Sequence, residues 1–159
     1  EAQLIAGAKG TDRAVSSVSV LEWPETKLLS NELIIGNELI ISALVTIKDD
    51  VARQCSVLRH LRNMGAAGLV LFYVGVFIPR IDEALIAVAD EINLPLIAMP
   101  FGRMDFRYSD MITDIVEYMV YIFHISVTSV SVTVTLPVFS SMVVSVTVVV
   151  RGSSVLVKV

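Results

Sequence analysis

Short apolar runs alternate with amphipathic segments, and this alternation limits the fold more than any other feature of the chain. Apolar runs occupy residues 4–7, 38–43, 68–73 and 96–99, and segments with helical periodicity separate the last three. Parallel strands need a crossover connection of about a dozen residues or more, usually a helix. The alternation therefore predicts an α/β fold, with a mostly parallel sheet flanked by helices.

The boundaries of these elements follow from residues that start or stop regular structure. A second strand spans Val15 to Val20 and ends before Trp23-Pro24, because proline has no N–H to donate to a ladder. Residues 25–35 give mixed signals. Asp49-Asp50 is expected to cap a helix that ends at Gly65. Its predicted apolar face consists of Val51, Cys55, Leu58 and Leu61, with Arg53, Arg59 and Arg62 on the solvent side.

Two further helices are predicted from the same periodicity. One follows Pro79 and ends at Asn93; its apolar face is Ile81, Leu85, Val88 and Ile92. The other begins at Ser109-Asp110, and its apolar face is Met111, Ile112, Ile115, Met119 and Ile122. The chain is thus expected to divide into an α/β domain over residues 1–123 and a tail over residues 124–159.

The tail has a different composition from the domain before it. No Asp, Glu, Lys or Arg occurs between Glu117 and Arg151, and the segment consists mainly of Val, Ser and Thr. Its length would cross a bilayer, but period-two alternation over residues 130–134 favours half-buried strands and no membrane span. Residues 143–150 and 155–159 are predicted strands joined by a turn at Gly152-Ser153. The alternative to such a β-meander is that no gene encodes this segment. Val, Thr and Ser are nearly isosteric, so residues assigned by shape alone would also produce a sequence of this kind.

Charge and cysteine content narrow the classes of function. Residues 1–123 hold 10 Lys/Arg and 16 Asp/Glu, a net charge of −6. An acidic domain repels phosphate backbones, so no direct binding of nucleic acid is expected. The single cysteine, Cys55, cannot form an internal disulfide and is expected to be a buried, inert thiol. Together with a first segment that lacks the features of a signal peptide, it predicts a cytoplasmic location.

No arrangement of residues for catalysis or metal binding is found. The Gly7–Gly10 turn lacks the Gly-Lys-Ser/Thr of a phosphate-binding loop. His60, His124 and Cys55 are too few and too scattered for a zinc site. We expect neither an enzyme nor a bound metal or cofactor.

Polar and aromatic side chains follow several predicted strands, where ligands gather in open α/β sheets. Glu22, Ser42, Tyr73 and Met99-Pro100 all lie at such ends. A small ligand is expected to hydrogen bond to Glu22 and Ser42 and to stack on Trp23 or Tyr73. Arg103 is expected to bind an anion. The alternatives are that Trp23 covers the sheet edge, that Glu22 is solvated and that Arg103 balances Asp105. Asp12-Arg13 is expected to be a turn ion pair or an Asx-turn, or to orient a ligand.

Several phrases resemble, in order and spacing, the N-terminal domain of PucR-type regulators, the purine catabolism regulatory protein-like family. They are Leu4–Val15 (LIAGAKGTDRAV) with Val18–Glu22, Gly36–Ser42 (GNELIIS), Gly65–Leu69 (GAAGL), Ile92–Ile97 (INLPLI) and Pro100-Phe101. The resemblance covers residues 4–122. A more distant similarity runs to the DRTGG-type and HPr-kinase N-terminal modules, which share the opening strand followed by Gly, Asp and Arg.

The resemblance implies a regulatory domain of a bacterial transcription regulator and not an enzyme. It implies a small-molecule effector, purine-related or another nitrogenous metabolite, a homodimer, and a DNA-binding helix-turn-helix outside this chain. The family continues with a linker and another regulatory domain, from which the tail departs. The alternative is a protein–protein interaction module without a ligand, in which helix 111–122 packs against a second copy.

Overall fold

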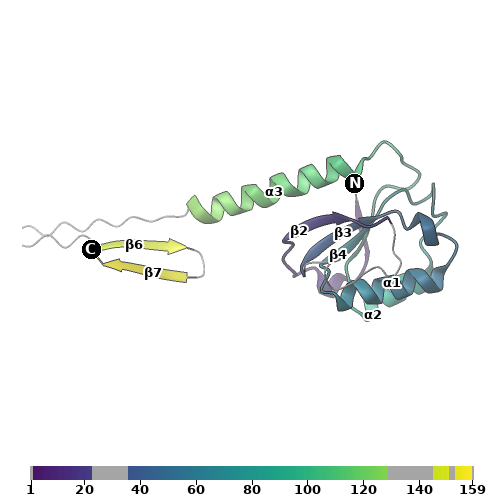
Figure 1. Ribbon diagram of the computed structural model, residues 1–159, viewed down its shortest axis with the longest axis horizontal. Helices are drawn as coiled ribbons and strands as arrows, with labels where there is room; N and C mark the ends of the chain where they lie inside the picture. The colour runs from purple at the N-terminus through teal and green to yellow at the C-terminus, as the bar shows by residue number, and fades with distance from the viewer. Residues whose placement is uncertain (1, 23–35, 129–144, 151–152, 159) are drawn as a thin grey trace, which may run out of the picture. The chain divides into compact units, whose positions relative to one another are not determined.

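The computed structural model describes residues 2–22, 36–128, 145–150 and 153–158, with side chains up to Ile122. Contacts divide the chain into two compact units, Glu1–Thr113 and Asp114–Val159. The first unit contains a five-stranded sheet with helices packed against it (Figure 1). The α/β class predicted from the sequence is confirmed, whereas the predicted domain boundary after residue 123 stays a prediction.

The sheet is parallel except at one edge. Its strands lie in the order β1-β5-β4-β3-β2. Their bounds are β1 Gln3–Ala6, β2 Ser17–Val20, β3 Glu38–Ser42, β4 Gly68–Leu71 and β5 Leu96–Ala98. Strands β2 to β5 run parallel, with Ile41 opposite Val70 and Val70 opposite Ile97. Strand β1 pairs antiparallel with β5, and its register shifts between Leu4 and Ala6.

Helices α1 (Val51–Asn63) and α2 (Glu83–Glu91) connect successive parallel strands, and an aspartate caps the N-terminus of each helix. Asp50 Oδ1 accepts a hydrogen bond from the Arg53 N–H at 2.9 Å, as its predicted capping role requires. Asp82 Oδ1 accepts one from the Ala84 N–H at 2.9 Å. The helix expected after Pro79 begins at Glu83, because the chain is extended at Asp82.

The buried face of α1 differs from the predicted one. Gln54 and Val57 are buried beside Leu58 and Leu61, whereas Val51 and Cys55 are only partly covered. Gln54 is tolerated there because its Nε2 donates to the carbonyls of Ile47 and Lys48, each at 3.0 Å. The Ile47 carbonyl belongs to a short 3-10 turn, η2 (Val45–Ile47), which the sequence did not suggest. Burial raises the pKa of the partly covered Cys55 thiol.

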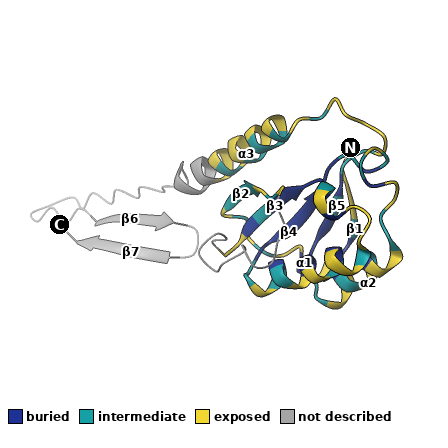
Figure 2. Ribbon diagram, turned by 45° about the vertical axis from the view of Figure 1, so that its right-hand side comes forward, coloured by how far each residue is buried: buried dark blue, intermediate teal, exposed yellow. Residues whose placement is uncertain are grey.

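Two hydrophobic clusters cover the two faces of the sheet. The larger joins strand residues such as Ile40, Leu69 and Leu96 to Leu58 of α1 and Leu85 of α2. Figure 2 shows these strands as the buried centre of the unit. The smaller, on the opposite face, consists of buried Ile41, Val70 and Phe72 with partly buried neighbours. These neighbours include Tyr108, Met111 and Ile112 from the start of α3 (Tyr108–Thr128).

Arginines gather at the carboxyl end of α2. Arg59 makes a two-pronged ion pair with Glu91, at 2.9 and 2.7 Å. Arg62 Nε donates to the Ile92 carbonyl at 3.1 Å, and Arg13 Nη2 donates to the Asn93 carbonyl at 2.9 Å. These carbonyls lie just past the helix end, which attracts positive charge. Arg59 and Arg62, predicted on the solvent side of α1, thus connect α1 to α2. Arg13 hydrogen bonds to Asn93, which is distant in the sequence, and not within its own turn.

In the second unit, α3 continues to Thr128, six residues beyond the last predicted helical position. No glycine or proline interrupts it, and β-branched residues lower helix propensity only slightly. Strands β6 (Ser145–Val150) and β7 (Ser153–Lys158) pair antiparallel, in agreement with the predicted tail strands. The expected run at 130–134 and Gly152 lie outside the described residues, and Ser153, expected in the turn, is the first residue of β7. Among the helices described, none combines the length and hydropathy that a membrane span requires.

Candidate functional site

The predicted ligand-binding residues do follow the carboxyl ends of parallel strands. Strands β2, β3 and β4 end at Val20, Ser42 and Leu71, so Glu22, Ser42 and Tyr73 lie at one edge of the sheet. Trp23 lies outside the described residues. The contacts of these side chains show how much of their polar surface is available to a ligand.

Ser42 is fully buried and organises the backbone that follows β3. Its hydroxyl oxygen accepts a hydrogen bond from the Leu44 N–H at 3.0 Å. Leu44 has a φ of 48°, in the left-handed region that leucine rarely adopts. The Ser42 hydroxyl therefore stabilises an unfavourable turn before η2, which is a structural role.

Glu22 and Tyr73 belong to an aromatic cluster, which we define as Phe72, Tyr73, Phe77 and Tyr108. The rings of Phe72 and Tyr108 meet edge to face with centroids 4.7 Å apart, and those of Tyr73 and Tyr108 lie 5.6 Å apart. The Tyr108 hydroxyl donates to Glu22 Oε1 at 2.5 Å. Burial, and then the Glu22 carboxylate, raise the pKa of Tyr108. The Tyr73 hydroxyl donates to the Phe106 carbonyl at 3.1 Å.

Tyr108 is a residue that the sequence analysis missed. It is the first residue of α3, one position before the predicted start of the helix at Ser109. An aromatic residue three positions before Met111 continues the apolar spacing of the helix, and this spacing was the available signal.

Arg103 is engaged within its own exposed loop. Its Nε donates to Asp105 Oδ1 at 2.6 Å, and its Nη2 forms a second, shorter contact with the other carboxylate oxygen. The guanidinium also lies 5.2 Å from the centre of the Phe106 ring. The carboxylate raises the pKa of Arg103, and the guanidinium lowers the pKa of Asp105. Arg103 and Asp105 therefore form a local ion pair, which was the alternative interpretation of Arg103 from the sequence.

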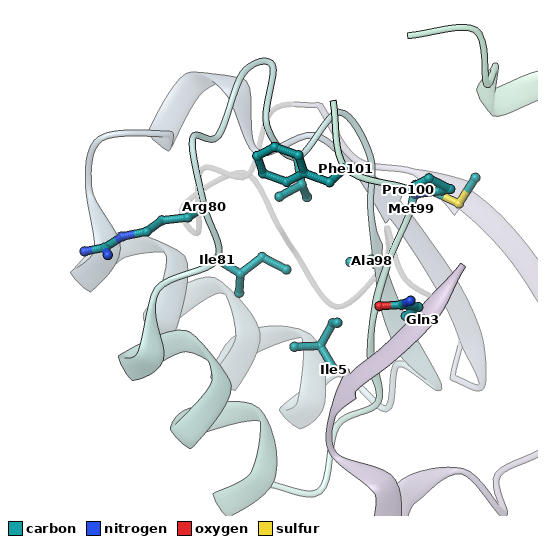
Figure 3. Close-up of a pocket in the computed structure, with 9 residues that line it drawn as sticks. Gln3, Ile5, Arg80, Ile81, Ala98, Met99, Pro100 and Phe101 are labelled. Carbon is teal, nitrogen blue, oxygen red and sulfur yellow. The ribbon is translucent and has the colours of Figure 1, made fainter. Parts of the chain in front are cut away.

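A pocket of about 510 Å³ opens at the same edge of the sheet, beside the end of β5 (Figure 3). It is lined by Gln3, Ile5, Val74, Arg80, Ile81, Ala98, Met99, Pro100 and Phe101. Ligand pockets in proteins typically have about 300–1,000 Å³. Of its lining, only Met99-Pro100 was expected at a strand end. Gln3 and Ile5 were missed because the antiparallel pairing of β1 with β5 was not predicted, and Val74, Arg80, Ile81 and Phe101 lie in loops between the helices and strands.

Two loops that meet above the sheet form one wall of this pocket. The Gly102 N–H donates to the Val74 carbonyl at 2.7 Å, and the Gly75 N–H donates to the Ile78 carbonyl at 2.7 Å. The Phe101 ring rests on Gly75, where a Cβ would come within 2.7 Å of its Cζ. Gly75 also has a φ of +84°, so a residue with a side chain is unsuited to this position. The wall is therefore defined by specific contacts between residues of the two loops.

The fold and this pocket define an α/β domain with a small-molecule-sized cavity at the carboxyl edge of its parallel strands. Within the described part of the chain, no group of three or more His, Cys, Asp or Glu is arranged to hold a metal ion.

The chain belongs to the purine catabolism regulatory protein-like family, whose model matches residues 1–119. It is also similar to the purine catabolism regulatory protein of Bacillus subtilis (strain 168), with 27% identity over 99 residues. That alignment covers 62% of this chain but only 18% of the Bacillus protein. No solved structure matches the chain significantly.

Proposed function

We propose that this domain senses a small metabolite on behalf of a bacterial transcription regulator of purine catabolism, and that it is not an enzyme. The pocket at the carboxyl edge carries the proposal, since it has the size and position of ligand sites in open α/β sheets. Family membership supports a regulatory role in purine catabolism. The DNA-binding part would lie outside this chain, in the cytoplasmic full-length regulator.

The contacts of the β4–α2 loop offer a path from the pocket to α3. Val74 lines the pocket, and the preceding residue, Tyr73, contacts Tyr108 and the Phe106 carbonyl at the base of that helix. Tyr73 has a φ of 56°, an uncommon conformation that its surroundings must hold in place. A ligand that binds one arrangement of this loop better than another would shift the start of α3 with it.

In this proposal the residues predicted from the sequence support the site rather than contact the ligand. Each of the side chains of Glu22, Ser42, Tyr73 and Arg103 has at least one polar atom in a hydrogen bond within the protein. Glu22 and Tyr73 would transmit the effect of binding through Tyr108. Glu22→Ala is therefore expected to change the ligand-dependent shift of the start of α3 more than it changes the affinity for the ligand.

A thermal-shift screen tests the proposal. The chain is heated with purines, their breakdown products and other small nitrogenous metabolites, because a ligand that binds only the folded state raises its stability. At a hundredfold excess over Kd the gain is about 2.7 kcal/mol, a rise of several degrees in Tm. Ile81→Trp, which fills the pocket, should abolish the rise. Lys9→Gln, an exposed change outside the pocket lining, should leave it unchanged.

A second candidate, a protein–protein interaction module that forms a homodimer, is favoured by exposed apolar side chains of α3. Val116, Tyr118, Val120 and Tyr121 are 47%, 66%, 55% and 60% exposed. Contiguous exposed apolar surface usually marks a contact site. If no compound raises Tm while light scattering shows a dimer that Val120→Glu dissociates, this candidate replaces the sensor. A monomeric mass at high protein concentration would contradict it.

A further inference from the structure

Most of the residues that line the pocket of about 510 Å³ have apolar side chains. Ile5, Ile81 and Ala98 project toward its centre from three different segments (Figure 3). Such a lining favours an uncharged ligand, because a charge placed against it would lose hydration without gaining a partner.

Phe101 provides a flat aromatic surface at one side of the pocket. One face of its ring lies on Gly75, which keeps the ring in place, yet the side chain is 69% exposed. An exposed ring that is held at one face can stack with a planar ligand at the other. The shape of this wall therefore favours a flat ring over a flexible chain.

Gln3 contributes a carboxamide at the rim of the pocket, from the edge strand β1. Within the described part of the chain, no residue hydrogen bonds to its side chain. A carboxamide offers one acceptor and one donor side by side, and it pairs with a ring edge that presents the complementary two groups. Adjacent C=O and N–H groups of a cyclic amide are such an edge.

The charges near the mouth do not favour an anion. Arg80 is the cation of the lining, but its guanidinium points away from the cavity (Figure 3). On that side it borders a depression of about 290 Å³ whose other lining residues are Ile81, Asp82 and Glu83. Two carboxylates beside the arginine offset its attraction for a phosphate or carboxylate.

We propose that the pocket binds a flat, uncharged nitrogen heterocycle with a cyclic amide edge, which stacks on Phe101 and pairs with Gln3. The inference rests on the proposed sensor function and specifies the chemical class of its ligand. Arg80 contributes little to binding.

Three probes that share one ring system test this class by calorimetric titration of the chain. Hypoxanthine has the cyclic amide, purine lacks it, and inosine 5′-monophosphate adds a ribose and a charged phosphate to hypoxanthine. We expect hypoxanthine to bind at least about fivefold tighter than purine, as the loss of one or two hydrogen bonds predicts. The nucleotide should bind more weakly than hypoxanthine. The reverse order of hypoxanthine and nucleotide would overturn the inference while leaving a sensor in place.

Single substitutions separate the roles of the three side chains. Phe101→Ala should weaken hypoxanthine binding about tenfold, the typical effect of a lost stacking partner. Gln3→Met, similar in shape but without the carboxamide, should remove the preference for hypoxanthine over purine. Arg80→Gln should change Kd less than about twofold, as surface charges outside a contact usually do. Phe101→Leu, together with the Tm of each free variant, controls for damage to the fold.

The outcomes distinguish a wrong ligand class from a wrong function. If anionic compounds bind and Arg80→Gln abolishes their binding, the inference fails but the sensor function holds. If a metabolite of another class binds and Phe101→Ala has no effect, the inference also fails alone. If neither the three probes nor the wider metabolite panel binds to a folded chain, both fail.

Discussion

Three residues near the N-terminus clamp the turn that follows α2. Gly7 and Gly10 lie so close to the turn that a Cβ would come within 2.0 Å of the Leu94 carbonyl oxygen and 2.2 Å of the Asn93 carbonyl oxygen, respectively. The Gly7 N–H also donates to Asp90 Oδ1 at 2.7 Å, and Arg13 donates to the Asn93 carbonyl. The opening phrase that resembles the regulator family therefore has a packing role in this fold.

Substitution of Gly7 should expose this role. In Gly7→Ala the new methyl group meets the backbone at Leu94, and the φ of +73° is strained for alanine. We expect a loss of about 3 kcal/mol or more in the free energy of unfolding, measured by urea denaturation. Gly36→Ala is the matched control, because its Cβ would meet no atom of the described residues within 4 Å. Equal stability of the two variants would contradict the clamp.

At the scale of elements, the base of α3 is joined to the sheet by Tyr108. Its ring packs on Phe72 after β4, and its hydroxyl reaches Glu22 after β2, so one side chain contacts the ends of two strands. Little in the sequence indicates this contact, because Glu22 and Tyr108 are separated by 86 residues. Periodicity predicted the helix, but its docking depends on the sheet beneath it.

The pH dependence of stability should report this contact. The pKa of Tyr108 is raised above its ordinary value of 10.0, so near and above pH 10 the folded state retains a proton that the unfolded chain loses. The free energy of unfolding should therefore fall as the pH rises from 9 to 11. Tyr108→Phe should cost about 1 kcal/mol at pH 7 and reduce this slope.

Urea denaturation across this pH range measures both effects. Tyr118→Phe, at an exposed position of the same helix, is the control and should retain the slope of the unmodified chain. An unchanged slope in Tyr108→Phe would show that the tyrosine does not keep its proton through burial and Glu22.

At the scale of the whole molecule, both described core clusters draw their residues from between Ile5 and Ile112. The first unit therefore has a core of its own. The tail differs in composition and lies within the second unit, Asp114–Val159, whose described strands pair with one another. A domain with its own core is expected to fold without such an appendage.

Truncation to residues 1–123 tests this independence. We expect a cooperative thermal transition, followed by circular dichroism, whose Tm lies within about 4 °C of the full chain, equivalent to about 1 kcal/mol. The same truncated protein should keep the thermal shift of any ligand found in the screen, because the whole pocket lining lies before residue 102. Loss of cooperativity would mean that the tail contributes to the fold of the first unit.

The sequence by itself determined the α/β class, the parallel strands β2 to β5, the cap at Asp50 and the polar residues at the strand ends. These features depend on neighbours within a few positions, through periodicity and capping. Tertiary structure alone decided that β1 pairs antiparallel with β5, that Arg13, Arg59 and Arg62 bind the end of α2, and that Phe101 and Gln3 share a pocket. Their partners lie far apart in the chain, and packing of the complete sheet brings them together.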